Sequence, residues 1–192
     1  MRAAARSAIT AVSPSVVEAE IPLEEKQVNN RNNGGSSFKR PDWDEYFIEI
    51  AKVVSSRSTC LRRRYGAVIV KDNVIISTGY NGAPRGSINC IDTGRCRRKE
   101  LNVPAGERYE LCEAVHAEQN AIINGSPERM KDGTIYVAGF EDDSSTAEGK
   151  PCLLCKRMIR NAQLQQVVFL SKKGELVKVW DLKELDTPSA NI

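Results

Sequence analysis

A single histidine constrains how this chain can fold, because it lies in a pattern typical of a metal site. His116 opens the tripeptide His-Ala-Glu at residues 116–118, and a Pro-Cys-Leu-Leu-Cys segment follows at residues 151–155. One imidazole with the thiolates of Cys152 and Cys155 suits Zn²⁺, and three protein ligands leave the fourth position free for water. These two segments must therefore meet in the folded chain.

Each of the two segments is expected at the start of a helix. The pattern predicts one helix over about 116–123, stopped by Asn-Gly, and another over about 151–161. Cys152 and Cys155 then face the same side, and the helix N-terminus favours their thiolate forms. Residues two apart do not share a helical face. His116 can therefore converge with the glutamate two positions later only at a helix entrance.

Two simpler interpretations of the motif are a redox Cys-x-x-Cys pair and a purely structural zinc site with a core histidine. The position of the only histidine, ahead of Pro-Cys-x-x-Cys, disfavours both. The arrangement resembles the signature of zinc-dependent nucleobase deaminases. That resemblance implies that Glu118 takes a proton from the zinc-bound water, delivers it to the ring nitrogen, and later protonates the departing ammonia.

The amino-acid composition argues against several other functional classes. The 192 residues suit one domain, and 41% hydrophobic with 28% charged residues fits a soluble globular protein. A net charge of +3 is too mild to indicate a nucleic-acid or membrane-surface binder, and no apolar run approaches the roughly 20 residues of a membrane span. We expect a cytoplasmic protein, in which six cysteines indicate metal rather than disulfides.

The chain is expected to have two parts. Residues 1–39, which include a polar Asn-, Gly- and Ser-rich run at 29–37, are predicted to be a disordered or flexible tail. Residues 40–192 are predicted to form the catalytic domain. It should begin with a helix opened by Pro41 and capped by Asp42.

The remaining pattern indicates an α/β fold. Apolar periodicity predicts a helix after Asp42, and a long irregular segment with little periodicity runs from Gly79 to Arg108. Helices should cover both faces of one sheet. The predicted strands lie at 66–70, 74–78, 134–138, 167–170 and 176–180, with a turn at 71–73 and a polar loop at 141–150.

Four segments together resemble the deoxycytidylate (dCMP) deaminases, over about residues 40–170. They are Arg-Pro-Asp-Trp-Asp (40–44), Gly-Tyr-Asn-Gly-Ala-Pro (79–84), the segment 116–122 and the segment 151–155. The resemblance implies a three-layer α/β/α fold with a mixed five-stranded sheet, and hydrolysis of dCMP to dUMP and ammonia as a precursor supply for dTMP. It also implies a homo-oligomer, hexamer or dimer, activated by dCTP and inhibited by dTTP, with Mg²⁺ accompanying the triphosphates.

The same resemblance implies substrate-binding residues. Asn81 is expected to hydrogen-bond the nucleotide, since an amide both donates and accepts; the alternative is a turn residue that tolerates a left-handed backbone. Asn120 lies one helical turn beyond His116 and could order the pocket or cap a neighbouring backbone. Arg57 and Arg85 offer charge for a phosphate, of the substrate or of an effector, as do the arginines at 62–64. A solvated surface role is equally open for each arginine.

Four cysteines remain after the catalytic pair, which is the number that a closed zinc site needs. A second zinc would hold the long irregular segment in place. Some dCMP deaminases carry a second zinc whose cysteine ligands Cys60 and Cys90 resemble. Free thiols or a disulfide are the alternative. The four are Cys60, Cys90, Cys96 and Cys112.

Two rival functions stay open. One is another deaminase of the superfamily, acting on a free nucleoside or on an adenosine in transfer RNA. A nucleic-acid substrate is disfavoured, because 6% aromatic residues offer few stacking platforms for flipped bases. The other is a zinc-stabilised binding module without catalysis, which would have no reason to keep Glu118.

Overall fold

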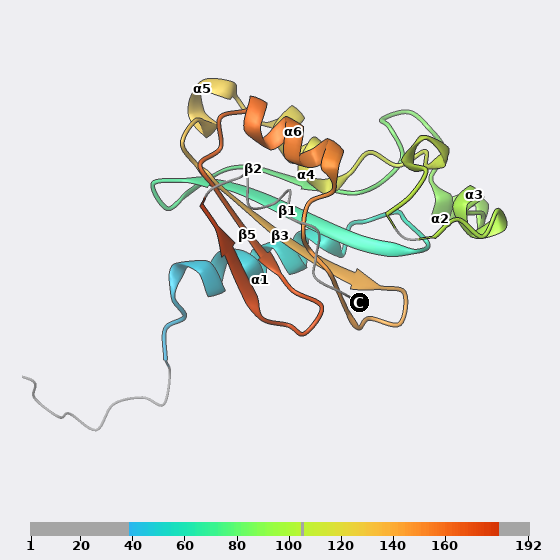
Figure 1. Ribbon diagram of the computed structural model, residues 1–192, viewed down its shortest axis with the longest axis horizontal. Helices are drawn as coiled ribbons and strands as arrows, with labels where there is room; N and C mark the ends of the chain where they lie inside the picture. Colours follow the sequence, from blue (N-terminus) through green and yellow to red (C-terminus); the bar gives the residue numbers. More distant parts are fainter. Residues whose placement is uncertain (1–38, 105, 181–192) are drawn as a thin grey trace, which may run out of the picture. The chain divides into compact units, whose positions relative to one another are not determined.

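A mixed β-sheet forms the centre of the fold in a computed structural model that describes residues 39–104 and 106–180. Five strands follow the order β2-β1-β3-β5-β6, and a short β4 pairs with β3 (Figure 1). Only β3 and β5 run parallel; the other pairs are antiparallel. The strands are β1 (Arg63–Lys71), β2 (Val74–Tyr80), β3 (Thr134–Glu141), β4 (Thr146–Ala147), β5 (Gln166–Leu170) and β6 (Leu176–Val179).

Helices cover both faces of this sheet, as the sequence predicts (Figure 1). Helix α1 packs on one face, and α4 lies on the other face beside α6. The helices are α1 (Trp43–Ser55), α2 (Cys90–Thr93), α3 (Arg97–Glu100), α4 (Ala117–Asn124), α5 (Pro127–Met130) and α6 (Leu153–Asn161), with a 3₁₀ turn at Tyr109–Leu111.

Side chains of strand β1 alternate between the two faces of the sheet and so contribute to both layers of the core. Val68 and Val70 pack with α1, while Ala67 and Ile69 pack with the buried residues of α4 and α6. All four are at most 5% exposed. A strand buried on both faces must be apolar at every position, which explains the continuous apolar run in this segment.

Two local signals place the elements around the core. Asp42 caps α1 in a capping box, since its Oδ1 accepts from the backbone N–H of Glu45 (2.8 Å) while the Glu45 carboxylate accepts from the N–H of Asp42 (3.0 Å). Asp72 and Asn73 both have positive φ (50° and 60°) in the β1–β2 turn. Two such residues match the right-handed twist of a hairpin.

The predicted boundaries need small corrections. Strands β1 and β3 run several residues beyond the predicted 66–70 and 134–138, because the backbone ladder between them continues past the apolar core. Strand β4 forms within the segment 141–150, which was predicted to be loop. The helix expected from Pro151 begins at Leu153. The predicted tail lies, except for its last residue, outside the described residues.

The segment predicted to be irregular, Gly79 to Arg108, overlaps the end of β2, which runs to Tyr80. The chain forms few regular elements over residues 81–116, which are called the irregular segment from here on. Only α2, α3 and the 3₁₀ turn interrupt it within the described residues. Across the described ranges, no helix is long and apolar enough to cross a bilayer.

Gly79 fixes how closely α4 approaches the sheet. A Cβ at this position would collide with the backbone N of Ala121 and the backbone O of Ala117, and would lie 2.7 Å from the carbonyl carbon of Asn120. We therefore expect Gly79→Ala to lower the free energy of unfolding by about 1–3 kcal/mol or more, because rigid backbone cannot move aside. Chemical denaturation measures this effect.

Val74→Ala on the same strand is the matched control, because the Val74 side chain is 55% exposed. It should change the free energy of unfolding by less than about 0.5 kcal/mol. Equal effects of the two substitutions would contradict the close approach at Gly79.

Candidate metal centre

The expected metal ligands lie at the entrances of two helices. His116 is the N-cap of α4 and Cys152 is the N-cap of α6, both with extended backbone (ψ 158° and 167°). Cys155 follows one turn into α6. Because an N-cap lies outside the helical spiral, the His116 side chain can turn toward α6, as the two-residue spacing to Glu118 requires.

The three ligand atoms are close together. His116 Nδ1 lies 3.5 Å from Cys152 Sγ and 3.3 Å from Cys155 Sγ. All three atoms fall within 4.8 Å of one another, and this is the only such group among the described residues. A nitrogen and two sulfurs are a ligand set that Zn²⁺ accepts, with one tetrahedral position left open. The residues present therefore fit a catalytic zinc.

The two thiols and the imidazole shift one another's pKa values, because they lie within hydrogen-bonding distance. Hydrogen bonding from Cys155 lowers the pKa of Cys152 to about 4, against the effect of burial, and His116 lowers it further. The bond to Cys152, together with burial, raises the pKa of Cys155. Burial lowers the pKa of His116, but the Cys152 hydrogen bond and the Glu118 charge outweigh it and the net shift is upward. The site already favours one thiolate before any cation is added.

Glu118 lies in the first turn of α4 and is 6% exposed. Burial raises the pKa of its carboxyl group, while the His116 charge opposes that shift. A carboxyl group whose pKa is raised by burial holds a proton more readily and can both accept and return it. Its position beside the ligands, without being one of the three, suits a proton carrier.

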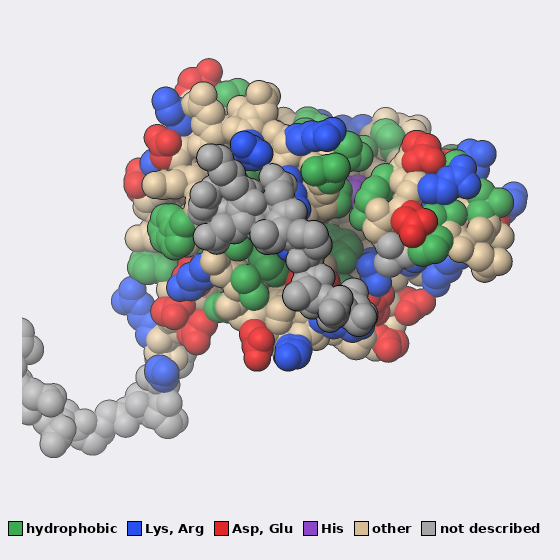
Figure 2. Space-filling model, viewed as in Figure 1, with side chains coloured by type: hydrophobic (Ala, Val, Ile, Leu, Met, Phe, Trp, Pro, Cys, Tyr) green, Lys and Arg blue, Asp and Glu red, His purple; other side chains and the backbone are tan. Residues whose placement is uncertain are grey.

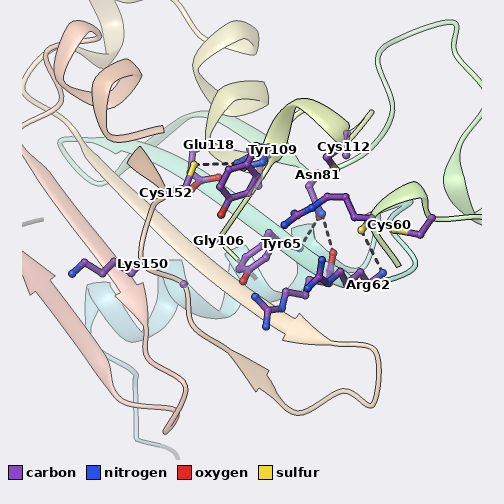
Figure 3. Close-up of a pocket in the computed structure, with 17 residues that line it drawn as sticks. Cys60, Arg62, Tyr65, Asn81, Gly106, Tyr109, Cys112, Glu118, Lys150 and Cys152 are labelled. Atoms are coloured by element: carbon purple, nitrogen blue, oxygen red, sulfur yellow. Dashed lines mark hydrogen bonds between the residues drawn. The ribbon is translucent and has the colours of Figure 1, made fainter. Parts of the chain in front are cut away.

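A cavity of about 120 Å³ opens beside these residues (Figure 3). Glu118 and Cys152 lie at one side of it, with Tyr65, Asn81 and Tyr109 around it. In Figure 2 the purple of the single histidine is visible as a small patch within a hollow of the surface. The remaining lining residues are Cys60, Arg62, Arg63, Cys96, Arg98, Gly106, Cys112, Ala114, His116, Ala117, Gly149 and Lys150.

Asn81 lines this cavity, but its amide also ties the residue that follows β2 to strand β1. Its Oδ1 accepts from the backbone N–H of Tyr65 (2.7 Å) and its Nδ2 donates to the backbone O of Arg63 (2.9 Å). One lone pair and one N–H are left over for a ligand. The structure therefore gives Asn81 a structural role and leaves room for the expected recognition role.

The other expected substrate contacts lie away from the cavity. Asn120 Nδ2 donates to the backbone O of Tyr80 (2.7 Å), and Arg85 Nη2 donates to Asn124 Oδ1 (2.7 Å). Arg57 is exposed just beyond α1, which covers the opposite face of the sheet from α4. None of the three lines the cavity.

The four remaining cysteines gather at one end of the site without reaching metal-binding distance. Cys60, Cys96 and Cys112 line the cavity. Cys90 lines an adjoining hollow together with Cys96 and Cys112. Burial raises the pKa of Cys90, and the other three thiols raise it further. They form no disulfide. The group found within 4.8 Å does not include them.

Sequence reasoning missed four lining residues. Tyr65 and Tyr109 are the aromatic walls, and Arg98 and Lys150 are cations at the cavity. Only Lys150 carried a signal, since it directly precedes the Pro-Cys-x-x-Cys segment. Tyr65 belongs to a strand, and the other two lie in the irregular segment, where no periodicity predicts which side chains turn inward.

Nitrogen and sulfur ligands on an α/β scaffold define a zinc-binding protein, and comparison with known proteins narrows the class. Residues 41–171 match the family described as the cytidine and deoxycytidylate deaminase zinc-binding region. Since the match covers more than half of the chain, the chain belongs to this family.

Two relatives in sequence agree with this family. The chain is 37% identical over 130 residues to a deoxycytidylate deaminase of Schizosaccharomyces pombe, covering 68% of this chain and 37% of that protein. It is 39% identical over 136 residues to that of Mycobacterium phage D29, covering 69% of this chain and 97% of that protein. A solved apo structure of a dCMP deaminase from cyanophage S-TIM5 is 26% identical with a TM-score of 0.48, covering 68% of this chain and 84% of that one.

Proposed function

We propose that this protein hydrolyses dCMP to dUMP and ammonia. The observation that carries the proposal is a buried carboxyl group, Glu118, beside a His-Cys-Cys ligand set at a cavity. The relatives in S. pombe and in phage D29 are deoxycytidylate deaminases, which supports this substrate. The chain spans about a third of the S. pombe protein and nearly all of the phage protein.

His116, Cys152 and Cys155 hold the zinc in this mechanism. When bound, zinc acidifies a water molecule and so supplies a nucleophile at neutral pH. Glu118 would take one proton from that water and deliver it to the ring nitrogen next to the attacked carbon. It would then take the second proton from the new hydroxyl group on that carbon and pass it to the amino group, which leaves as ammonia. Its burial suits this role, because a raised pKa lets the carboxyl group hold each proton between its removal and its delivery.

A monophosphate needs cations near the cavity. Arg62, Arg63 and Lys150 line it and supply positive charge, although Arg62 Nη1 donates to the backbone O of Val103 (3.1 Å) and Arg63 pairs with Glu141 (2.8 Å). Asn81 contacts the nucleotide through its remaining donor and acceptor. Contributions of Arg57, Arg85 and Asn120 remain part of the proposal, and would require these side chains to act outside the cavity.

The proposal includes features implied by family resemblance alone. They are a cytoplasmic homo-oligomer, activation by dCTP, inhibition by dTTP, and Mg²⁺ bound with the triphosphates. A panel of assays with and without each effector measures the regulation.

The substrate is tested by ammonia release from dCMP, deoxycytidine, dCTP and guanine, each supplied separately to the zinc-loaded protein. We expect dCMP to be the best substrate, because the lining cations have no partner on a free nucleoside. Turnover of deoxycytidine with none of dCMP would refute the monophosphate assignment. Absence of turnover on every substrate would favour a binding module.

The proton carrier is tested by Glu118→Gln, which keeps the size of the side chain. We expect kcat to fall at least about 100-fold, the usual scale of a lost general acid and base, with zinc retained. Glu128→Gln on α5 is the matched control, because Glu128 is exposed and lies outside the cavity. Equal rates for the two variants would contradict the mechanism.

A second zinc on Cys60, Cys90, Cys96 and Cys112 is also proposed. Four neighbouring thiols without a disulfide support it, and the sulfurs would have to move closer together to share one ion.

Zinc counting by native mass spectrometry tests both metal sites. We expect two zinc ions per chain in the wild type and one in Cys152→Ala or in Cys90→Ala, because each change removes one ligand set. Leu153→Ala is the control, since Leu153 is exposed beside Cys152. A single zinc in the wild type would refute the four-sulfur site, and an unchanged count in Cys152→Ala would refute the catalytic ligand set.

A further inference from the structure

Arg98 is a buried cation without an ion pair among the described residues. It belongs to α3, it is 8% exposed, and none of the described carboxylates pairs with it. Its Nη2 donates to the backbone O of Pro104 (2.8 Å) and of Glu107 (2.6 Å), while its buried Nε has no hydrogen-bond partner. Burying a guanidinium is costly unless other contacts compensate. A side chain kept at such a cost is a candidate for a specific role.

The guanidinium stacks on an aromatic ring that leads to the metal centre. Arg98 Cζ lies 5.0 Å from the ring centroid of Tyr109. The Tyr109 ring in turn meets the His116 ring edge to face, with centroids 5.1 Å apart and planes at 69°. Figure 3 shows Tyr109 beside Glu118 and Cys152 at the cavity. Arg98, Tyr109 and His116 therefore form a continuous chain of ring contacts that ends on a proposed metal ligand.

The His116 ring is held from two sides. Its Nδ1 faces the sulfurs of Cys152 and Cys155, and the Tyr109 ring packs against it. Metal-binding histidines are usually oriented by a hydrogen bond from the other ring nitrogen to a carboxylate or carbonyl. Within the described part of the chain, no hydrogen bond to Nε2 is present. The ring contact with Tyr109 can supply the orientation instead.

We infer that Arg98 is a positioning residue of the metal centre. It ties down the backbone at Pro104 and Glu107 and, through the stacked Tyr109 ring, fixes the orientation of the His116 imidazole. This inference rests on the metal ligands of the proposed function. The alternative role for a cation at the cavity is a direct contact with the substrate phosphate, which would act on substrate binding rather than on the metal.

Four substitutions separate these roles. Arg98→Met removes the cation, and Arg98→Lys keeps the charge without the planar group that stacks and donates to two carbonyls. Tyr109→Leu removes the ring, and Tyr109→Phe keeps it. Arg97→Met is the matched control: Arg97 is exposed on the same helix, carries the same charge and directly follows Cys96.

The first readout is the metal itself. We expect Arg98→Met and Tyr109→Leu to change the visible absorption spectrum of the cobalt-substituted protein and to weaken zinc affinity about 10- to 100-fold, the scale seen when groups that orient metal ligands are lost. Tyr109→Phe and Arg97→Met should match the wild type. Arg98→Lys should fall between the wild type and Arg98→Met.

Steady-state kinetics on dCMP give the second readout. We expect kcat to fall in Arg98→Met with KM unchanged, since the Asn81, Tyr65 and Tyr109 side chains of the cavity remain. Tyr109→Leu also removes a wall of the cavity, so its metal properties, and not its KM, are the readout for that variant. A rise in KM alone, with a cobalt spectrum and zinc affinity equal to those of Arg97→Met, would overturn the inference in favour of phosphate binding. If Arg98→Met does not fold, equal metal properties of Tyr109→Leu and Tyr109→Phe would overturn it.

The metal readouts also keep the two proposals apart. If the wild type does not deaminate dCMP, the proposed function fails, while the cobalt spectra of the same variants still decide the role of Arg98.

Discussion

The convergence of two helix N-termini on one point is the constraint on which the rest of the structure depends. His116 and Cys152 are both N-cap residues, and they meet only because α4 and α6 lie side by side on one face of the sheet. The parallel pairing of β3 with β5 makes this possible, since α6 connects these two strands on that face. Both helix dipoles then point their positive ends toward the sulfurs.

The centre is bordered by the two buried charged side chains of the described residues. Glu118 lies in the first turn of α4. Arg98, in the irregular segment, packs over the Tyr109 ring, and that ring contacts His116. A carboxylate and a guanidinium in a poorly hydrated region interact more strongly with a bound cation and its ligands than they would in water. The irregular segment therefore contributes charge and shape to the site, even though it contributes little to the core.

The sequence predicts the parts of this protein that depend on local pattern. The starts of α1 and α4, the hairpin turn at Asp72 and Asn73, and the proximity of the three expected metal ligands follow from capping, turn chemistry and motif spacing. The residues that line the cavity cannot be predicted from local pattern. Tyr109 and Arg98 belong to a segment without periodicity, and only its tertiary folding brings them to the cavity. For the same reason the phosphate contacts expected of Arg57 and Arg85 stay predictions. Charge in the sequence does not say which face of the sheet a side chain will reach.

Asn81 has a consequence for how a ligand would be received. Its backbone N–H donates to the carbonyl of Tyr65 (3.2 Å), its backbone O accepts from Thr59 and Ser58, and its amide links β1 at two further points. Such a side chain has already lost its rotamer freedom when the chain folded. A molecule that reaches this amide therefore meets a preorganised group, and binding incurs no further loss of conformational entropy at that contact.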